Sequence, residues 1–261
     1  MFHKKSKIKN KLFVSVELKA QAINAINSYL VYGFPSPFTF WGFAHNVALQ
    51  LGTKLNEESV LYITHSFQNR IEKDCFSQIK STQRVKNNKV GTISDLPRAD
   101  IYTTIVFALE EDEEIIINKS KVKAIVQKSR FSGGTILQNS IKINIEPTEA
   151  KLMQSIREKG FLCKEKHIEL KEGRELDDFV EILSIKKGKK GWLAPSLLGY
   201  LPIDKPEFKK GSRKSYKHQF AEPIIGVTEF YNFNRFENTL SEDGWYLDVS
   251  DNLIKIQNKE R

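Results

Sequence analysis

The chain has 261 residues, of which 40% are hydrophobic and 28% are charged. This composition excludes a disordered chain and suits a globular protein with one large core or two small ones. Lysine and arginine outnumber aspartate and glutamate by 41 to 32, and this basic balance favours a polyanion or an acidic protein as the partner.

Cysteine usage and hydropathy exclude further classes. Cys75 and Cys163 stand in unlike contexts and have no zinc-ligand spacing, so we expect neither a disulfide framework nor a metal or other cofactor. The lysine-rich stretch over 1–11 is followed by no apolar segment, and no run reaches the length of a membrane span. We therefore expect a soluble, cytoplasmic protein without membrane contact.

The first 146 residues predict an α+β domain. In chain order we expect a strand over 11–18, a loop or short helix over 20–27, a helix over 38–51, a strand over 59–64, a candidate strand over 75–80, a polar stretch over 81–94, a strand over 101–109, a helix over 120–129, a turn at Gly133-Gly134 and a strand over 136–145. This order is that of the ferredoxin-like fold of RRM domains. We therefore expect an antiparallel sheet with helices over 1–146.

The remaining residues, 147–261, predict a less regular C-terminal extension packed on the first domain. Helices are expected over 149–159 and 176–183, a basic loop over 186–190 and a Pro- and Lys-rich stretch over 202–217. A strand is expected over 220–231, before a polar and charged tail.

The segment from Arg130 to Gly134 is the best candidate for RNA contact. Gly133 and Gly134 allow a phosphate to approach the backbone amides, and the Arg130 guanidinium is a planar donor for phosphate or a guanine edge. Phe131, next to Ser132, would stack on a splayed base. The alternative is a tight β-turn with Phe131 in the core and Arg130 in solvent.

Three further basic groups are candidates. Arg84, Lys86 and Lys89 lie in a polar stretch between two predicted strands, which would project as a thumb and clamp an RNA backbone, or would be a solvated loop. A second group adjoins an aromatic residue and comprises Lys186, Lys187, Lys189, Lys190 and Trp192. A third group comprises Lys205, Lys209, Lys210, Arg213, Lys214 and Lys217. Its ligand is the RNA backbone, target DNA or an acidic protein partner, and the sequence does not decide among them.

Several short motifs, in the same order, resemble landmarks of one family. They are Gly33-Phe34-Pro35, Phe40-Trp41-Gly42-Phe43-Ala44-His45, Phe131-Ser132-Gly133-Gly134-Thr135-Ile136, Gly191-Trp192-Leu193-Ala194-Pro195 with Gly199-Tyr200, and Phe220-Ala221-Glu222-Pro223-Ile224. The family is the type I-F CRISPR Cascade subunit that caps the 5′ end of the guide RNA, in the Cas five branch of the RAMP superfamily, also called Csy two.

The resemblance implies a non-catalytic RNA-binding protein of antiviral defence. Its members are RRM-like, carry a protruding thumb, hold the 5′ handle of the crRNA and contact the large and backbone subunits of Cascade. The alternative is a RAMP-type endoribonuclease that processes crRNA with His45 as general acid or base, because related RAMP proteins cleave RNA in this way. A scaffold that binds only proteins is a third class.

Overall fold

The computed structural model describes residues 11–26, 33–70, 97–110, 115–169, 171–184, 192–208, 210, 216–234, 236–250 and 253–258. Among them are five α-helices, a short 3-10 helix and the strands of one large antiparallel sheet. The elements in chain order are β1 (Lys11–Asn24), α1 (Pro37–Leu51), β2 (Leu55–Asn69), β3 (Arg98–Glu110), α2 (Lys119–Lys128), β4 (Arg130–Phe131), β5 (Gly134–Ile136), η2 (Gln138–Ser140), β6 (Lys142–Glu146), α3 (Glu149–Ser155), β7 (Phe161–Lys166), α4 (Glu175–Ser184), β8 (Trp192–Pro202), β9 (Ala221–Asn232), α5 (Leu240–Asp243), β10 (Trp245–Ser250) and β11 (Leu253–Asn258).

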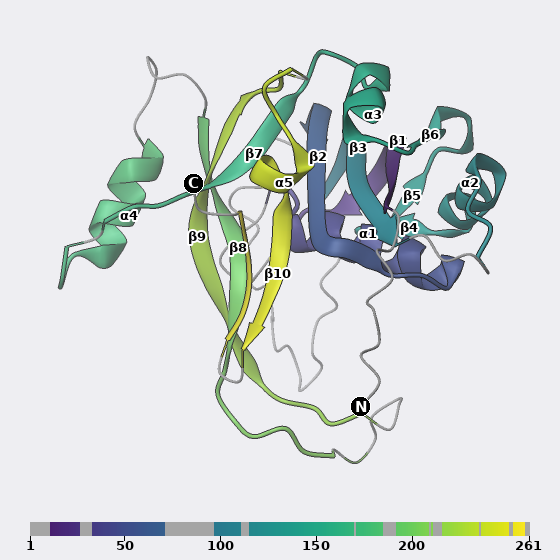
Figure 1. The fold of residues 1–261 in the computed structure, drawn as a ribbon. Helices are drawn as coiled ribbons and strands as arrows, with labels where there is room; N and C mark the ends of the chain where they lie inside the picture. The colour runs from purple at the N-terminus through teal and green to yellow at the C-terminus, as the bar shows by residue number, and fades with distance from the viewer. Residues whose placement is uncertain are drawn as a thin grey trace, which may run out of the picture.

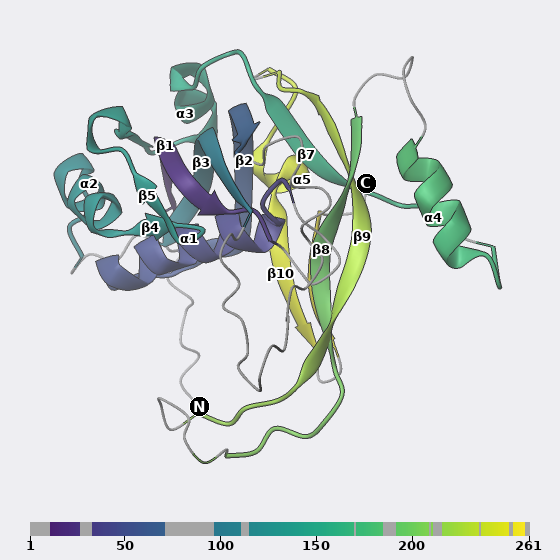
Figure 2. The same cartoon turned by 180° about the vertical axis from the view of Figure 1, so that it is seen from behind.

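The strand order of the sheet is β10-β11-β8-β9-β7-β2-β3-β1-β5-β4, with β6 also beside β1. The last hairpin returns to the first half of the chain, because Trp245 of β10 pairs with Val60 of β2. The strands β2, β7, β9, β8, β11 and β10 therefore close a six-stranded ring, and β3 and β1 extend the sheet from β2. Figures 1 and 2 show this ring on one side of the molecule and the helices α1, α2 and α3 on the other.

Helix α1 fixes one side of the core. Its N-cap Ser36 accepts a hydrogen bond from the Phe38 N–H at 3.2 Å, Pro37 occupies the first turn, and Gly52 ends the helix at φ 81°. Each of these residues suits its position, since Ser caps helices, Pro needs no N–H donor there, and Gly tolerates a left-handed C-terminus. The buried face of the helix packs beside β2 and β3.

The two faces of β3 serve two different clusters. Successive side chains of a strand point to opposite faces of the sheet. Ile105 and Phe107 belong to the main core under α1 and α2, whereas Val106 and Ala108 pack with Leu152 and other residues of the α3 region. Helix α3 thus covers part of the face opposite α1.

Most predicted elements of the first half are confirmed, namely the helices over 38–51 and 120–129 and the strands over 11–18, 59–64 and 101–109. The expected loop over 20–27 is wrong, because β1 continues to Asn24 through an irregularity at Ala22, whose φ is 52°. The single strand over 136–145 is also wrong. The chain breaks there into β5, η2 and β6, and the Leu137 N–H turns back to donate to the Lys19 carbonyl at 2.9 Å.

Outcomes differ along the rest of the chain. The helix expected over 149–159 ends earlier, at Ser155, while the helix over 176–183 and the strand over 220–231 correspond to α4 and β9. The polar tail contains more structure than expected, because it forms α5, β10 and β11 and buries Trp245. The stretches over 75–80 and 81–94 lie outside the described residues.

The division at residue 146 stays a prediction. Strands from both sides of it share one sheet, because β7 and β10, which follow that residue, pair with β2, which precedes it. The buried Cys163 of β7 lies at this junction. Burial raises the pKa of its thiol to about 12.

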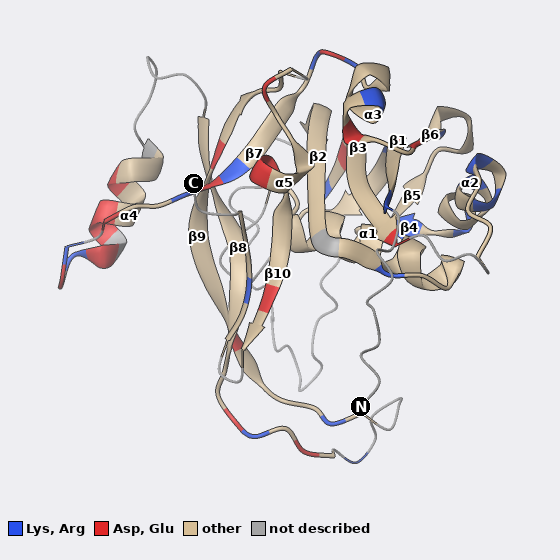
Figure 3. Cartoon of the chain, in the orientation of Figure 1, with Lys and Arg blue, Asp and Glu red and all other residues tan. Residues whose placement is uncertain are grey.

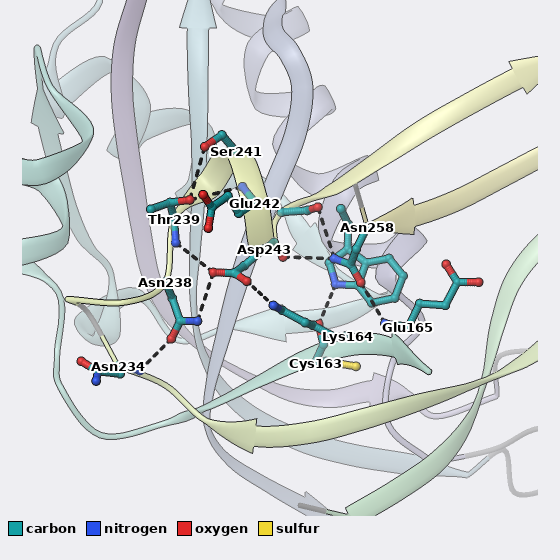
Figure 4. A network of polar contacts seen from close by, with 12 residues as sticks. Cys163, Lys164, Glu165, Asn234, Asn238, Thr239, Ser241, Glu242, Asp243 and Asn258 are labelled. Atoms are coloured by element: carbon teal, nitrogen blue, oxygen red, sulfur yellow. Dashed lines mark hydrogen bonds and ion pairs between the residues drawn. The ribbon is translucent and has the colours of Figure 1, made fainter. Parts of the chain in front are cut away.

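A buried polar network, here called the Asp243 network, holds the C-terminal segment against β7 (Figure 4). The fully buried Asp243 carboxylate forms an ion pair with Lys164 and accepts hydrogen bonds from the Asn238 amide at 3.0 Å and the Thr239 N–H at 2.9 Å. The Asn258 amide donates to the Asp243 and Gly244 carbonyls at 3.1 and 3.2 Å. The network therefore joins β7, α5 and β11.

Candidate nucleic-acid interface

The β4–β5 turn has the tight geometry that the glycine pair predicts. Arg130 pairs with Thr135, and Ser132 and Gly133 between the two strands have φ values of 46° and 74°. Two successive residues in the left-handed region are typical of a two-residue hairpin turn of type I′. The Arg130 guanidinium donates to the Gly133 carbonyl at 3.3 Å, and both residues are exposed. The tip of the turn therefore presents a guanidinium and an accessible backbone.

The two glycines have different roles. At Gly133 an added Cβ would meet nothing within 4 Å, so this glycine is required by its positive φ alone. At Gly134 an added Cβ would lie 2.5 Å from the Gln21 carbonyl oxygen and 2.7 Å from Ile23. Gly134 is buried against β1, so the prediction that both glycines offer their backbone to a ligand is wrong for Gly134.

Phe131 lies in the core. Its side chain is fully buried and meets the rings of Phe40 and Phe43 edge-on, at centroid distances of 5.2 and 5.5 Å. The ring has no free face for a base, so the prediction that Phe131 stacks on RNA is wrong. The alternative, a tight turn with Phe131 inside and Arg130 outside, matches the structure.

The turn is fastened to the end of β1. The Asn24 N–H donates to the Ser132 carbonyl at 2.8 Å, and the Ser132 hydroxyl donates to the Asn24 carbonyl at 3.1 Å. Asn24 pairs in turn with Arg98, the first residue of β3, and the Ala25 N–H donates to the Pro97 carbonyl at 3.1 Å. The turn and the start of β3 therefore lie side by side.

Two further arginines occupy this end of the sheet. Arg70, just after β2, holds Asp100 through two contacts of 2.8 and 2.9 Å, and its N–H donates to the Arg98 carbonyl at 2.8 Å. The Arg98 guanidinium donates to the Ala22 carbonyl at 3.3 Å. We call the surface formed by Arg70, Arg98, Arg130, Ser132 and Gly133 the sheet-end site.

The predicted thumb residues Arg84, Lys86 and Lys89 lie outside the described residues. The described residues that flank them in the chain are Arg70 and Pro97. These two lie at the same end of the sheet, because the Arg70 N–H donates to the carbonyl of Arg98, the residue after Pro97. The thumb itself stays a prediction.

Trp192 is half exposed, at 49%. Its ring stacks on Phe230 at 4.7 Å and meets Phe161 at 4.9 Å. Phe230 also contacts the ring of Phe34, which in turn contacts Phe67, three residues before Arg70 in the chain. The neighbouring Lys186, Lys187, Lys189 and Lys190 lie outside the described residues.

The third lysine group is described only in part. Lys205, Lys210 and Lys217 belong to the connection between β8 and β9, while Lys209, Arg213 and Lys214 lie outside the described residues. Figures 1 and 2 show the described parts of this connection extending away from the body, far from the β4–β5 turn. Figure 3 shows another concentration of lysines on α2, close to the turn.

The histidine considered for catalysis is a surface residue. His45 is exposed on α1, and its ring lies flat on Trp41 at a centroid distance of 4.9 Å and an angle of 10°. Within the described ranges, no three His, Cys, Asp or Glu side chains come together in a way that could hold a metal ion. The described helices also include none with the length and apolar character needed to cross a membrane.

The family described as CRISPR-associated protein (Cas_Csy2) matches residues 13–162, which is more than half of the chain. The chain belongs to this family. The resemblance found in its motifs is thereby confirmed, and the matched region includes the whole sheet-end site. The β8–β11 hairpins lie beyond the match.

One curated relative and one solved structure accompany the family match. The chain is 28% identical over 137 residues to the CRISPR-associated protein Csy2 of Pseudomonas aeruginosa (strain UCBPP-PA14), a stretch that covers 48% of this chain and 42% of that protein. The match thus spans less than half the length of the relative. The chain is also similar to a CRISPR protein of known crystal structure from Archaeoglobus fulgidus, with 11% identity, a TM-score of 0.34 and coverage of 95% and 99% of the two chains.

Sequence reasoning missed Arg70 and Arg98. Arg98 carried a signal, because it stands between the polar stretch over 81–94 and the strand predicted over 101–109. Arg70 carried none, because it stands between the strand predicted over 59–64 and the candidate strand over 75–80. Only the pairing of β1 with β3 and the hydrogen bonds between Asn24 and Ser132 bring them to the same end of the sheet as the β4–β5 turn.

Proposed function

We propose that the chain is a non-catalytic subunit of a type I-F-like CRISPR surveillance complex, Cascade, and that it binds the 5′ handle of crRNA at the sheet-end site. The observation that carries the proposal is that Arg70, Arg98 and Arg130 lie at one end of the sheet, beside an exposed turn. Among the described contacts of these arginines, Asp100 is the one carboxylate partner.

The chemistry of this surface suits a nucleic-acid backbone. Guanidinium groups bind phosphate through two parallel hydrogen bonds, and they keep their charge at any physiological pH. The open backbone at Gly133 adds room for a phosphate to come close. Such contacts position a strand and carry little sequence information, as a subunit that caps a guide requires.

The arrangement of the first half supports a ferredoxin-like fold for this part. β3 lies between β2 and β1, β6 lies on the other side of β1, and all of these pairings are antiparallel. With α1 and α2 packed on one face, this is the strand order that the β-α-β-β-α-β unit produces. The large and backbone subunits of Cascade would then be the protein partners, in the cytoplasm. For the third lysine group, the RNA backbone, target DNA and an acidic partner all stay open.

Salt-titrated RNA binding tests the proposal. The full chain is mixed with a labelled RNA of the CRISPR repeat encoded beside its gene, and fluorescence anisotropy is measured from low to physiological salt. We expect Arg130→Gln to weaken binding and to lower the slope of log affinity against log salt by about one. Arg174→Gln is the control, because Arg174 is an exposed arginine of the distant α4 region.

Two results would overturn the proposed function. One is the absence of RNA binding by the wild-type chain at low salt, and the other is equal weakening by Arg130→Gln and Arg174→Gln. Cleavage of the RNA, followed on a denaturing gel, would contradict the non-catalytic assignment, and its loss in His45→Ala would identify the nuclease alternative.

A further inference from the structure

A second polar cluster lies on the sheet face opposite α1 and α2. Tyr102 and Thr104 of β3 point to this face, while Thr103 between them is buried on the other. Helix α3 covers the face over Val106 and Ala108. Tyr102 lies beyond this cover, and the side chains around it are polar or charged. None of these side chains belongs to the sheet-end site.

Cations surround the Tyr102 ring. The Lys19 Nζ lies 5.0 Å and the Arg157 Cζ 5.7 Å from the ring centroid, both within the range of a cation–π contact. The Tyr102 hydroxyl donates to Glu17 and accepts from the Arg157 guanidinium at 3.4 Å. Lys142 pairs with the same Glu17 oxygen at 3.0 Å. These contacts place three cations around one aromatic ring and one carboxylate.

His65 positions the tyrosine from the side. Its ring is 4.6 Å from the Tyr102 ring and tilted by 50°. The Nδ1–H donates to the Lys159 carbonyl at 2.6 Å, and Nε2 lies 2.8 Å from the Thr104 hydroxyl. With both ring nitrogens engaged, His65 holds a fixed orientation beside Tyr102.

The cluster continues into a hollow at the edge of the sheet. An open hollow of about 300 Å³ is lined by Lys119 and Lys123 of α2 and by Lys142 of β6. Lys142 thus belongs to both the hollow and the Tyr102 cluster. A basic track leads from the sheet face around β6 to the lysines that Figure 3 shows on α2.

The cluster also adjoins the sheet-end site. Asp100, which holds Arg70, and Tyr102 are two residues apart on β3 and therefore point to the same face. At about 3.3 Å per residue they lie about 7 Å apart along the strand. One strand of RNA can therefore reach both surfaces.

We propose that Tyr102 is the base-stacking centre of a second, single-stranded RNA site, continuous with the sheet-end site. A base stacks on the Tyr102 ring, Lys19 and Arg157 turn to its phosphates, and the strand passes Lys142 toward Lys119 and Lys123. An aromatic ring surrounded by cations is the combination that sequence-tolerant single-strand sites use. This inference rests on the proposed function, because it assigns a further contact to the same RNA.

The test separates stacking from charge. Affinity for a single-stranded 12-nucleotide RNA is measured for the wild type, Tyr102→Phe and Tyr102→Leu. Phenylalanine retains the ring, so we expect Tyr102→Phe to bind within about twofold of the wild type. Loss of the ring should weaken binding about tenfold or more in Tyr102→Leu, as base–aromatic stacking predicts. Tyr246→Leu is the control, because Tyr246 is a half-buried tyrosine of β10 that bonds to Gln257.

A second ligand identifies the stacked base. An RNA of the same length with abasic positions keeps every phosphate, so Tyr102→Leu should no longer differ from the wild type with this ligand. Thermal unfolding of each variant shows that the fold is retained. Should Tyr102→Leu unfold, Tyr102→Phe and a photocrosslink from 4-thiouridine RNA to the peptide that contains Tyr102 replace it, and absence of that crosslink would overturn the inference.

The experiments distinguish failure of the Tyr102 site from failure of the proposed function. If the wild type binds RNA and Arg130→Gln weakens it, but Tyr102→Leu binds like the wild type, the second site is wrong and the proposed function stands. Equal loss with the abasic ligand would show that Tyr102 supports a phosphate site only, which also overturns the inference. Displacement of the RNA by poly-glutamate as readily as by unlabelled RNA would indicate an acidic protein as the occupant. A wild type that binds no RNA overturns both proposals.

Discussion

The Asp243 network and the sheet-end site are both built from charged and polar groups, yet they place these groups differently. In the network, a fully buried carboxylate is held by Lys164, Asn238 and a backbone amide. In the sheet-end site, Arg130 and Arg70 stand at the surface, and Arg70 is 44% exposed. The first arrangement makes stability depend on its contacts, while the second leaves charge accessible to a ligand.

The largest effect should come from breaking the Asp243 network. Lys164→Met leaves the buried Asp243 carboxylate without its cation, so we expect the free energy of unfolding to fall by about 3 kcal/mol, as for other broken buried ion pairs. Urea unfolding followed by circular dichroism measures it.

The chain offers a matched control for this change. Lys166 is two residues away on β7 and pairs with Glu229 at 3.0 Å, but both partners are partly exposed. Lys166→Met should therefore lower the free energy of unfolding by less than about 1 kcal/mol. Equal losses in the two variants would contradict the prediction, because they would show that the buried Lys164–Asp243 pair contributes no more to stability than the exposed Lys166–Glu229 pair.

The glycines of the β4–β5 turn give the next largest effect. Gly134→Ala would place a Cβ against the Gln21 carbonyl, and we expect a loss of about 2 kcal/mol from overpacking. Gly133→Ala meets open space and has only its φ of 74° to oppose it, so about 1 kcal/mol is expected. Unfolding midpoints in urea compare the two, and the reverse order would contradict the roles assigned to them.

The smallest effect is a pH dependence at the Tyr102 cluster, which is polar like the network but more exposed. Burial lowers the pKa of His65 below its ordinary value, more than the Lys159 carbonyl and Glu17 raise it. The folded state therefore binds fewer protons than the unfolded state near pH 6. The contribution of His65 to stability is present above its unfolded pKa, about 6.5, and is lost as the pH falls through its lower folded pKa.

Glu17 acts in the same direction at lower pH. Burial alone would raise the pKa of Glu17, but hydrogen bonds from Tyr102 and Lys142 outweigh it and hold the pKa below its ordinary value. Its contribution is present above an unfolded pKa of about 4.3 and is lost as the pH falls through the folded pKa.

Unfolding midpoints at pH 7 and 5.5 test the contribution of His65. Because glutamine does not titrate, the two midpoints should differ less in His65→Gln than in the wild type.

Local signals explain what the sequence could predict. Helix α1 follows from Ser36, Pro37 and Gly52, and the β4–β5 turn follows from its glycines, because caps and positive φ values are properties of a few adjacent residues. Burial of Phe131 could not be predicted in the same way. It depends on rings of α1 that come about ninety residues earlier in the chain.

The two proposed RNA surfaces were harder still to predict. The Tyr102 cluster takes Glu17 and Lys19 from β1, His65 from β2, Lys142 from β6 and Arg157 from the segment after α3. Each is unremarkable in its own stretch. Strand register decides which of them meet, and register is set by the whole sheet. Alternation within β3 did give one usable signal, since it places Tyr102 and Thr104 on one face.

The closed ring of strands has a consequence for synthesis on the ribosome. Part of β2 finds its partner only when Trp245 of β10, 185 residues after its partner Val60, has emerged from the ribosome. Until then the nascent chain displays open backbone groups along β2, a template on which another chain can pair. Cells that make this protein should therefore need chaperone protection of the growing chain, and truncated products that stop before β10 should accumulate as aggregates.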